Sequence, residues 1–147
     1  MKYSSATNYA LHTIVYLVIA PAGKSLGVKP LADKQNLSQA YLSKIMAKLV
    51  KAGFVESTVG VNGGYRLTRP PESISFMEVI EAIEGEEALF ACGDTHEHAI
   101  RVSGCLIQGV MDEAERAMEQ VLRERTIAQV AQRMGEECRA FVRREAQ

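Results

Sequence analysis

The feature that most constrains the fold is a short helix, a tight turn and a longer helix in succession between residues 29 and 53. The short helix should run from Lys29 to about Gln35, because Pro30 is well tolerated in the first turn of a helix. A tight turn at Asn36 separates it from the longer helix. Two helices joined in this way are typical of a helix-turn-helix.

The longer helix has clear boundaries and a regular apolar face. Ser38 is a suitable N-cap, and Gly53 lies where a C-cap belongs. Between them the apolar residues recur at helical spacing: Leu42, Ile45, Met46, Leu49 and Val50. One face of this helix should therefore pack in a core and leave the other face open.

A β-hairpin should follow directly. Phe54-Val55 and Tyr65-Leu67 flank residues 60–64, a turn rich in glycine and asparagine. A hairpin placed after the second helix of a helix-turn-helix is the wing of a winged helix.

Further helices are expected on both sides of this unit. One should run from residue 4 or 5 to residue 19 or 20, and another from a cap at Ser75 to Gly85. Thr126 should cap a short terminal helix, and we expect the charged tail from about Arg139 to fray.

The helix expected over residues 106–124 has an apolar seam suited to pairing with a second helix. The seam residues are separated by steps of three and four: Ile107, Val110, Ala114, Ala117 and Val121. Its alanines allow a second helix to approach closely.

The net charge of −1 conceals a marked asymmetry. Residues 1–70 contain nine Lys and Arg against two acidic residues, whereas residues 71–147 contain eight basic residues against sixteen acidic ones. A basic half joined to an acidic half indicates that the first half meets a polyanion.

These patterns predict a mainly α fold with a small β-hairpin, made of a winged helix-turn-helix DNA-binding domain plus a long dimerisation helix. Residues 1–70 would form the DNA-binding region, and residues 71–105 a linking helix and a cysteine-containing loop. Residues 106–147 would hold the dimerisation and C-terminal helices, all within one intertwined unit. The expected partners are a second copy of the chain and a pseudo-palindromic double-stranded DNA.

The DNA-binding residues should lie at the start of the longer helix and on the wing. Gln39 and Lys44 are the best candidates for base contacts, because glutamine suits adenine and lysine suits guanine. The full candidate set is Ser38, Gln39, Ala40, Tyr41, Lys44, Lys48, Asn62, Gly63, Gly64 and Arg66. The two glycines would let the wing backbone approach the duplex.

Three segments together carry a family resemblance: "MKYSSATNYALHTIVYL", "LSQAYLSKIMAKLVKAGFVES" and "GVNGGYRL". They resemble the Rrf-two family of bacterial winged helix-turn-helix regulators, which includes IscR, NsrR and CymR. The resemblance implies a homodimeric transcriptional regulator, in most cases a repressor, that senses iron–sulfur, nitric oxide or redox status. Val59 departs from the arginine usual in the wing, and Ser43 stands where some relatives have an acidic residue.

The same resemblance implies a [2Fe-2S] cluster in the loop that contains Cys92 and Cys105. Family members that hold a cluster typically have a third cysteine there, which is missing in this chain. His96 and His98 are possible substitutes, and the partner subunit's first helix could contribute His12 or, as a poorer ligand, Asn8.

Three alternatives to the cluster remain open. Cys92 or Cys105 could act as a cluster-free thiol sensor, through a sulfenate or an intersubunit disulfide. The loop could instead hold zinc through both cysteines and His96 or His98. Finally, the cysteines could be vestigial, with a protein or metabolite as the signal.

Other classes of protein fit the sequence poorly. No motif supplies the oxyanion hole or phosphate-binding loop that an enzyme built on these cysteines and histidines would need. The longest apolar run, residues 10–22, is too short and too polar for a membrane span. Because the odd cysteine count also disfavours a secreted disulfide scaffold, we expect a cytoplasmic protein that is not an enzyme.

Overall fold

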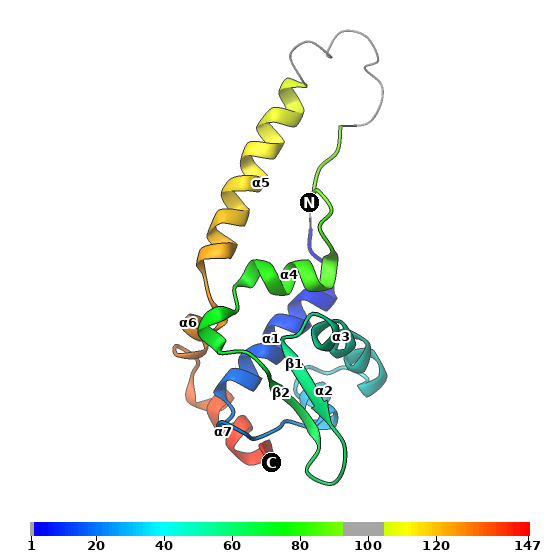
Figure 1. Ribbon diagram of the computed structural model, residues 1–147, viewed down its shortest axis with the longest axis vertical. Coiled ribbons are helices and arrows are strands. Elements are labelled where there is room, and N and C mark those ends of the chain that lie inside the picture. The colour runs from blue at the N-terminus through cyan, green and yellow to red at the C-terminus, as the bar shows by residue number, and fades with distance from the viewer. Residues whose placement is uncertain (1, 93–104) are drawn as a thin grey trace.

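The computed structural model describes residues 2–92 and 105–147. A helical body holds a small hairpin, and one long helix extends away from it (Figure 1). In chain order the elements are α1 Ser5–Ile19, α2 Val28–Lys34, α3 Gln39–Lys51, β1 Val55–Thr58, β2 Gly64–Leu67, the 3-10 turn η1 Pro71–Ser73, α4 Phe76–Glu84, α5 Leu106–Glu124, α6 Ile127–Ala131 and α7 Glu136–Glu145.

The core forms around α1, which contacts α3, α4, α6 and α7. Ala10 and Ile14 of α1 are fully buried, as is Ile127 of α6. Tyr16 packs edge-on against Phe141 of α7, with ring centroids 5.4 Å apart. One apolar cluster therefore includes residues from both the N-terminal and the C-terminal parts of the chain.

The helix-turn-helix has the predicted form. Asn36 adopts a left-handed φ of 55° between α2 and α3, and Gly53 with φ 83° follows the end of α3. The Ser38 side chain accepts a hydrogen bond from the Tyr41 backbone N–H at 3.2 Å, which confirms it as the N-cap. The apolar face of α3 is buried, as expected from its spacing.

The hairpin is antiparallel, with Val55 opposite Leu67 and Thr58 opposite Gly64. Leu26 joins it from the other side by two backbone hydrogen bonds with Tyr65, of 3.0 and 2.8 Å. A Cβ at Gly64 would lie only 2.4 Å from the Leu26 carbonyl oxygen. Gly64 is therefore required for packing inside the chain, a reason that differs from the close approach to DNA expected from the sequence.

Helix α4 connects several parts of the body. Ser75 and Glu78 form a capping box at its start, and Gly85 with φ 86° ends it, as predicted. At its end, Glu84 accepts hydrogen bonds from the Ser4 backbone N–H and the Thr7 hydroxyl, both at 2.6 Å. The Ser4 side chain makes no cap hydrogen bond. The Glu84 carboxylate of α4 therefore acts as the hydrogen-bond acceptor at the start of α1, where a serine cap was expected.

The expectation of a frayed tail from Arg139 was wrong. Helix α7 is formed over Glu136–Glu145, and Phe141 and Val142 are buried against the core. The chain then pairs with Ser25 through two backbone hydrogen bonds of Gln147, of 2.9 and 3.0 Å. Thus the C-terminal residues close the body beside the wing.

Helix α5 is the long helix expected over residues 106–124, and none of its residues is buried. It begins directly after Cys105, and its lower end contacts α4. In the part of the chain that the structure describes, no helix combines the length and apolar character that crossing a membrane would need.

Candidate nucleic-acid interface and sensor site

The first turn of α3 presents a polar surface to solvent. Ser38, Gln39, Ala40 and Lys44 are exposed, and Tyr41 is 40% exposed. Tyr41 packs edge-on against Tyr9 of α1, with ring centroids 6.1 Å apart, so its ring has a fixed position. This is the end of a recognition helix that meets base edges in a helix-turn-helix.

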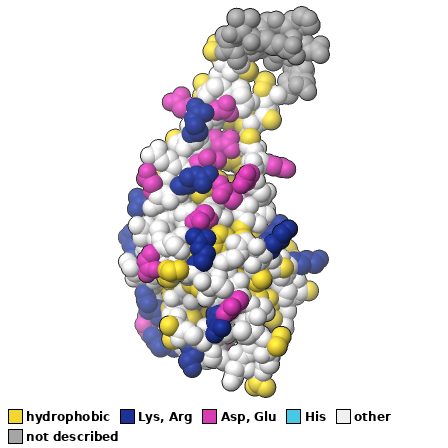
Figure 2. Space-filling view, in the orientation of Figure 1, with side chains coloured by type: hydrophobic (Ala, Val, Ile, Leu, Met, Phe, Trp, Pro, Cys, Tyr) yellow, Lys and Arg dark blue, Asp and Glu magenta, His cyan; other side chains and the backbone are white. Residues whose placement is uncertain are grey.

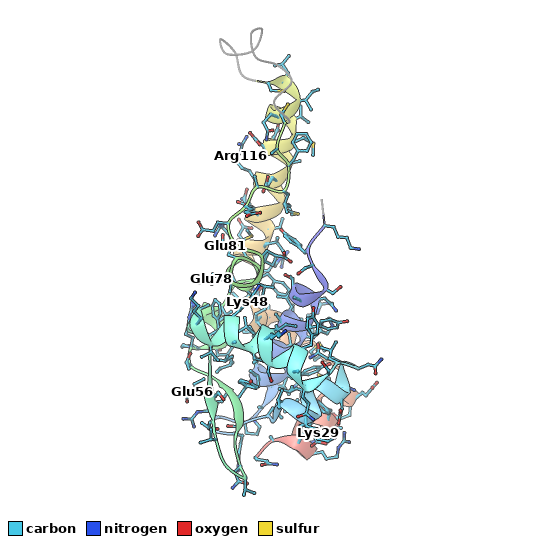
Figure 3. All side chains as sticks on the ribbon, turned by 90° about the vertical axis from the view of Figure 1, so that its right-hand side faces the viewer. Lys29, Lys48, Glu56, Glu78, Glu81 and Arg116 are labelled. Carbon is cyan, nitrogen blue, oxygen red and sulfur yellow. The ribbon has the colours of Figure 1, made fainter. Side chains whose placement is uncertain are left out.

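The two central lysines of α3 differ in their surroundings. Lys44 makes no hydrogen bond or ion pair within residues 2–92 and 105–147. The Lys48 Nζ atom donates a hydrogen bond to the Ile83 carbonyl oxygen at 2.9 Å, at the junction of α3 with the end of α4 (Figure 3). Lys48 is exposed on the outer face of α3, as predicted, but its ammonium group is already bonded to the end of a neighbouring helix.

The wing offers less charge than the sequence indicated. Arg66 forms an ion pair with Glu56, its partner across the two strands, and both side chains are partly buried. Asn62 is exposed at the turn, and Gly63 and Gly64 are partly buried. The free polar group at the tip is thus Asn62, whereas Arg66 already has a partner in the chain.

Cys92 and Cys105 lie next to each other although they are thirteen positions apart, with their Sγ atoms separated by 3.7 Å. Both cysteines are reduced and partly exposed. Two thiolates bound to one tetrahedral metal ion through bonds of ~2.3 Å are about 3.8 Å apart, whereas a disulfide is ~2.05 Å long. The separation of the two sulfur atoms therefore fits a pair of ligands to one ion.

Two side chains of α5 hold the segment before Cys92. Glu115 Oε1 accepts a hydrogen bond from the Leu89 backbone N–H at 3.0 Å, and the second side chain is Gln108. Its Oε1 accepts a hydrogen bond from the Cys92 backbone N–H at 2.7 Å, and its Nε2 donates to the Phe90 carbonyl oxygen at 3.2 Å. Nε2 also donates to Asp112 Oδ1 at 2.6 Å. The amide of Gln108 thus holds the segment before Cys92 against the first turn of α5.

The thiol of Cys105 has a lowered pKa. A hydrogen bond from the Gln108 backbone amide and one with Cys92 lower the pKa of the Cys105 thiol, and burial acts in the opposite direction. Cys138 differs, because burial raises the pKa of its thiol and Glu137 adds to that effect, against the charges of Lys34 and Arg139. Cys138 therefore fits a packed side chain of α7, in agreement with its 8% exposure.

The remaining candidate ligands are only partly placed. Within the described residues, no group of three or more His, Cys, Asp and Glu side chains could hold a metal ion. His96 and His98 lie outside these residues. Within the described residues, the two cysteines therefore account for at most two ligands of a metal centre.

Asn8 and His12 lie on one exposed flank of α1, one turn apart, as predicted. The Nδ1 atom of His12 lies 2.8 Å from the Asn8 carbonyl oxygen. Because a carbonyl can only accept, Nδ1 donates, which leaves Nε2 as the ring nitrogen with a free lone pair when the ring is neutral. That arrangement suits a metal-binding histidine.

A family model described as "Rrf2: Iron-dependent Transcriptional regulator" matches residues 3–133 of this chain. This chain belongs to the Rrf2 family. The match confirms the resemblance seen in the sequence, and the helical body with its two-stranded hairpin confirms the predicted winged fold. DNA binding and transcription regulation are properties of Rrf2 regulators, so the chain is a transcriptional regulator.

Individual Rrf2 relatives agree with this assignment. The chain is 34% identical over 128 residues to the HTH-type transcriptional regulator NsrR of Shouchella clausii, a match that covers 86% of each chain. Among solved structures it is similar to Staphylococcus aureus CymR in its oxidized form, at 27% identity and a TM-score of 0.73, covering 89% of this chain and 96% of that one. It is also similar to T. potens IscR, at 27% identity and a TM-score of 0.72, covering 93% and 90%. Its relatives are regulators, which confirms the expectation that it is not an enzyme.

Several residues of this Rrf2 chain act through partners that are distant in the sequence, and these residues were not predicted. Gln108, Glu84 and the cap formed by Lys48 all depend on partners at least sixteen positions away. A clue for Gln108 was present, since its position one turn after Cys105 places it beside the first turn of α5. No local pattern distinguishes Lys48 from Lys44.

Proposed function

We propose that this Rrf2 regulator acts as a homodimeric, operator-binding repressor whose DNA affinity depends on the state of the Cys92–Cys105 pair. The observation that carries the proposal is the 3.7 Å separation of the two sulfur atoms, in a segment that follows α4, whose end contacts α3 and the start of α1. Three parts of the chain would contribute: α3 and the wing, α5, and the cysteine pair.

DNA recognition would begin at the N-terminal end of α3. Gln39 can donate to and accept from an adenine edge, and Lys44 can donate to guanine. Lys44, Lys51 and Lys24 are exposed and make no ion pair in the described part of the chain, so their charges are available to phosphates. The duplex would then contact α3 and the wing together.

A second copy of the chain would pack along α5. Ile107, Val110 and Val121 are 65%, 66% and 55% exposed, and Ala114 and Ala117 between them are exposed too. A stripe of this spacing on one helix matches the seam of a coiled coil. Two-fold symmetry of such a dimer would favour a pseudo-palindromic operator with half-sites one helical turn or more apart.

The sensor would be a [2Fe-2S] cluster with Cys92 and Cys105 as two of its ligands. Further ligands would come from His12 of the partner subunit, with Asn8, His96 and His98 as other candidates. Such a cluster, when bound, supplies an oxidation state and a reactivity toward nitric oxide or oxygen that the protein alone lacks. The protein holds the two sulfur atoms together through Gln108 and keeps them at the surface.

A cluster-free thiol switch is the second candidate, and the lowered pKa of Cys105 favours it. An oxidant such as a peroxide would convert the Cys105 thiolate to a sulfenate, and Cys92 is close enough to condense with it to a disulfide, with release of water. In both cases the same two cysteines carry the signal.

Helix α4 provides a physical route from the cysteines to the DNA-binding helices. Its end holds Lys48 of α3 and, through Glu84, the start of α1. The chain passes from Gly85 directly to the segment that carries Cys92. A change at the pair that moves this segment would thus alter two hydrogen-bonded contacts of the DNA-binding unit.

Two experiments test the proposal. Gel mobility of promoter DNA should be retarded by the wild-type protein, and Gln39→Ala with Lys44→Ala should abolish the retardation. The visible absorption spectrum of protein purified without oxygen separates the two sensors, because an iron–sulfur cluster gives a brown protein and a thiol switch a colourless one. If the wild-type protein bound no promoter DNA, the proposal that it is an operator-binding repressor would be contradicted.

A further inference from the structure

The tip of the wing carries two apolar side chains that have almost no contact with the rest of the described chain. Val59 is 98% exposed and Val61 is 96% exposed. The turn does not depend on them, since Gly60 has φ 107° and the Gly63 N–H donates to the Gly60 carbonyl oxygen at 3.0 Å. Leaving two branched apolar side chains in water is unfavourable, and no packing in the described part of the fold offsets it.

The wing tip is continuous with the DNA-binding surface. Its strands follow α3 directly, and the Thr68 N–H donates to the Phe54 carbonyl oxygen at 3.0 Å, at the base of the hairpin. Leu26 pairs with Tyr65 of β2 as an isolated β-bridge beside that base. Figure 1 shows the turn between β1 and β2 extending beyond the rest of the body. Backbone hydrogen bonds therefore hold the base of the wing, whereas its tip is exposed to solvent.

The chemistry of the tip is neutral. Residues 57–65 contain no charged side chain, and Arg66, the cation that follows them in the sequence, is paired with Glu56. Lys29 of α2 lines the same pocket as Val61 and is paired with Asp33. Such a tip cannot neutralise a phosphate, but its methyl groups can pack on the deoxyribose walls of a minor groove. Several minor-groove proteins also place apolar side chains in that groove, where they insert between base steps. A protein partner fits less well, because two valines are far smaller than a stable protein interface.

We propose that Val59 and Val61 form an apolar contact with the minor groove, which adds operator affinity without adding salt dependence. The inference rests on the proposed DNA-binding function. Salt dependence counts the phosphates that a protein neutralises, and valines neutralise none. This contact would set the wing of this chain apart from wings that use a cation.

The test uses the full-length protein and a labelled duplex of about 30 base pairs, selected by the wild-type protein from a randomised pool. The double variant Val59→Ser, Val61→Ser should bind this duplex at least about tenfold more weakly, because a dimer has two wings and each loses apolar contact area. The slope of log affinity against log salt should stay the same as in the wild type. Hydroxyl-radical protection of the deoxyriboses facing the wing should disappear.

Two further variants serve as controls. Val59→Ile with Val61→Ile keeps the apolar tip and should retain wild-type protection. Val59→Arg adds one cation per wing and should steepen the salt slope by about 2 for a dimer. Both valines are almost fully exposed, so loss of folding does not complicate either comparison.

The outcomes separate the two levels of the proposal. The proposed apolar contact would be overturned if the serine variant kept wild-type affinity and protection, or if Val59→Arg left the slope of log affinity against log salt unchanged. Neither result would contradict the proposed DNA-binding function. Normal DNA binding by the serine variant with loss of repression in a purified transcription assay would assign the valines to a protein partner. A wild-type protein that selects no duplex would overturn the proposed function, and the wing contact with it.

Discussion

Lys44 and Lys48 are one turn apart on α3, yet their ammonium groups meet different surroundings. Lys44 faces solvent, whereas Lys48 donates to the Ile83 carbonyl oxygen at the end of α4. The same residue type on the same helix can therefore serve DNA binding in one case and the stability of a helix junction in the other.

This pair gives a matched experiment. Lys44→Ala should weaken operator binding and lower the salt slope by about 2 per dimer, because each subunit loses one cation at the duplex. Lys48→Ala should lower the free energy of unfolding by about 1 kcal/mol, because it leaves a helix-terminal carbonyl without its partner. Urea unfolding and fluorescence anisotropy at several salt concentrations measure the two effects. Equal salt slopes for the two variants would contradict the expectation that Lys44 contacts the duplex and Lys48 stabilises the junction of α3 with α4.

The cysteines differ in the same way at the residue scale. The pKa of Cys105 is lowered by its hydrogen bonds, and the pKa of Cys138 is raised by burial. Since alkylation requires the thiolate, iodoacetamide should modify Cys105 at a lower pH than an ordinary thiol, and Cys138 only at higher pH or after unfolding. Peptide mass spectrometry across a pH series measures both rates, and faster modification of Cys138 in the native protein would contradict the assignment.

At the element scale, the sequence predicted those helices whose boundaries depend on local chemistry. Ser38, Ser75 and Thr126 cap their helices as expected, because each cap bonds a backbone amide three positions away. Helix α7 was missed because its charged residues obscured a short apolar stripe at helical spacing: Cys138, Phe141 and Val142. Those side chains become a helix face only because α1 and α2 lie beside them.

In the candidate DNA-binding surface and the cysteine pair, too, features that depend on local sequence were predicted and contacts that depend on tertiary packing were not. The exposed start of α3 and the neighbouring cysteines were found from spacing and resemblance. The contacts of Lys48 with Ile83 and of Arg66 with Glu56 were not predicted, since tertiary packing and strand pairing set them. Helical periodicity gives the face of a residue but not the neighbouring element on that face.

Helix α4 makes a prediction of its own through Glu84. Partial burial acts to raise the pKa of this carboxyl, but hydrogen bonds from Thr7 and Ser4 and the charge of Lys48 outweigh it and lower the pKa. A carboxyl with a lowered folded pKa stabilises the fold above its unfolded pKa of ~4.3, and this contribution is lost as pH falls through the folded value.

Glu84→Gln should therefore reduce the free energy of unfolding by about 1 kcal/mol at neutral pH, because the charged hydrogen bonds are weakened. The difference from the wild type should shrink toward zero as the pH falls through the lowered folded pKa of Glu84. Urea unfolding across pH measures it, with exposed Glu87→Gln as the control, which should stay within about 0.5 kcal/mol of the wild type. A difference that does not change with pH would show that Glu84 acts by packing alone.

At the scale of the whole molecule, charge separates the parts of the chain. Acidic side chains gather over α5 and the neighbouring part of α4 (Figure 2). Glu81, Glu115 and Glu119 line a groove of about 560 Å³ between these helices. Burial and the nearby charges of Glu119, Glu115 and Glu84 raise the pKa of Tyr3 in the same groove. This surface would repel phosphate, so DNA should bind at the opposite end, around α3 and the wing.

The exposed seam of α5 predicts an assembly. Val110→Asp places a charge in the middle of the proposed seam and should convert a dimer to a monomer, with loss of operator affinity because the half-sites are no longer bound together. Val110 is 66% exposed, so the monomer fold should not change. Sedimentation velocity measures the mass, and Val110→Leu should remain dimeric. If the wild-type protein were monomeric at all concentrations, the predicted dimerisation along α5 would be contradicted.

The central claim is that the state of Cys92 and Cys105 sets the affinity for DNA. The most direct measurement is the affinity of full-length protein, purified without oxygen, for one selected duplex before and after oxidation or removal of iron. The wild type should change its affinity by about tenfold or more, a shift within the usual range of coupling between two sites. Cys92→Ala and Cys105→Ala should each abolish that change. Equal affinity of the wild type and both variants under every redox condition would contradict the account.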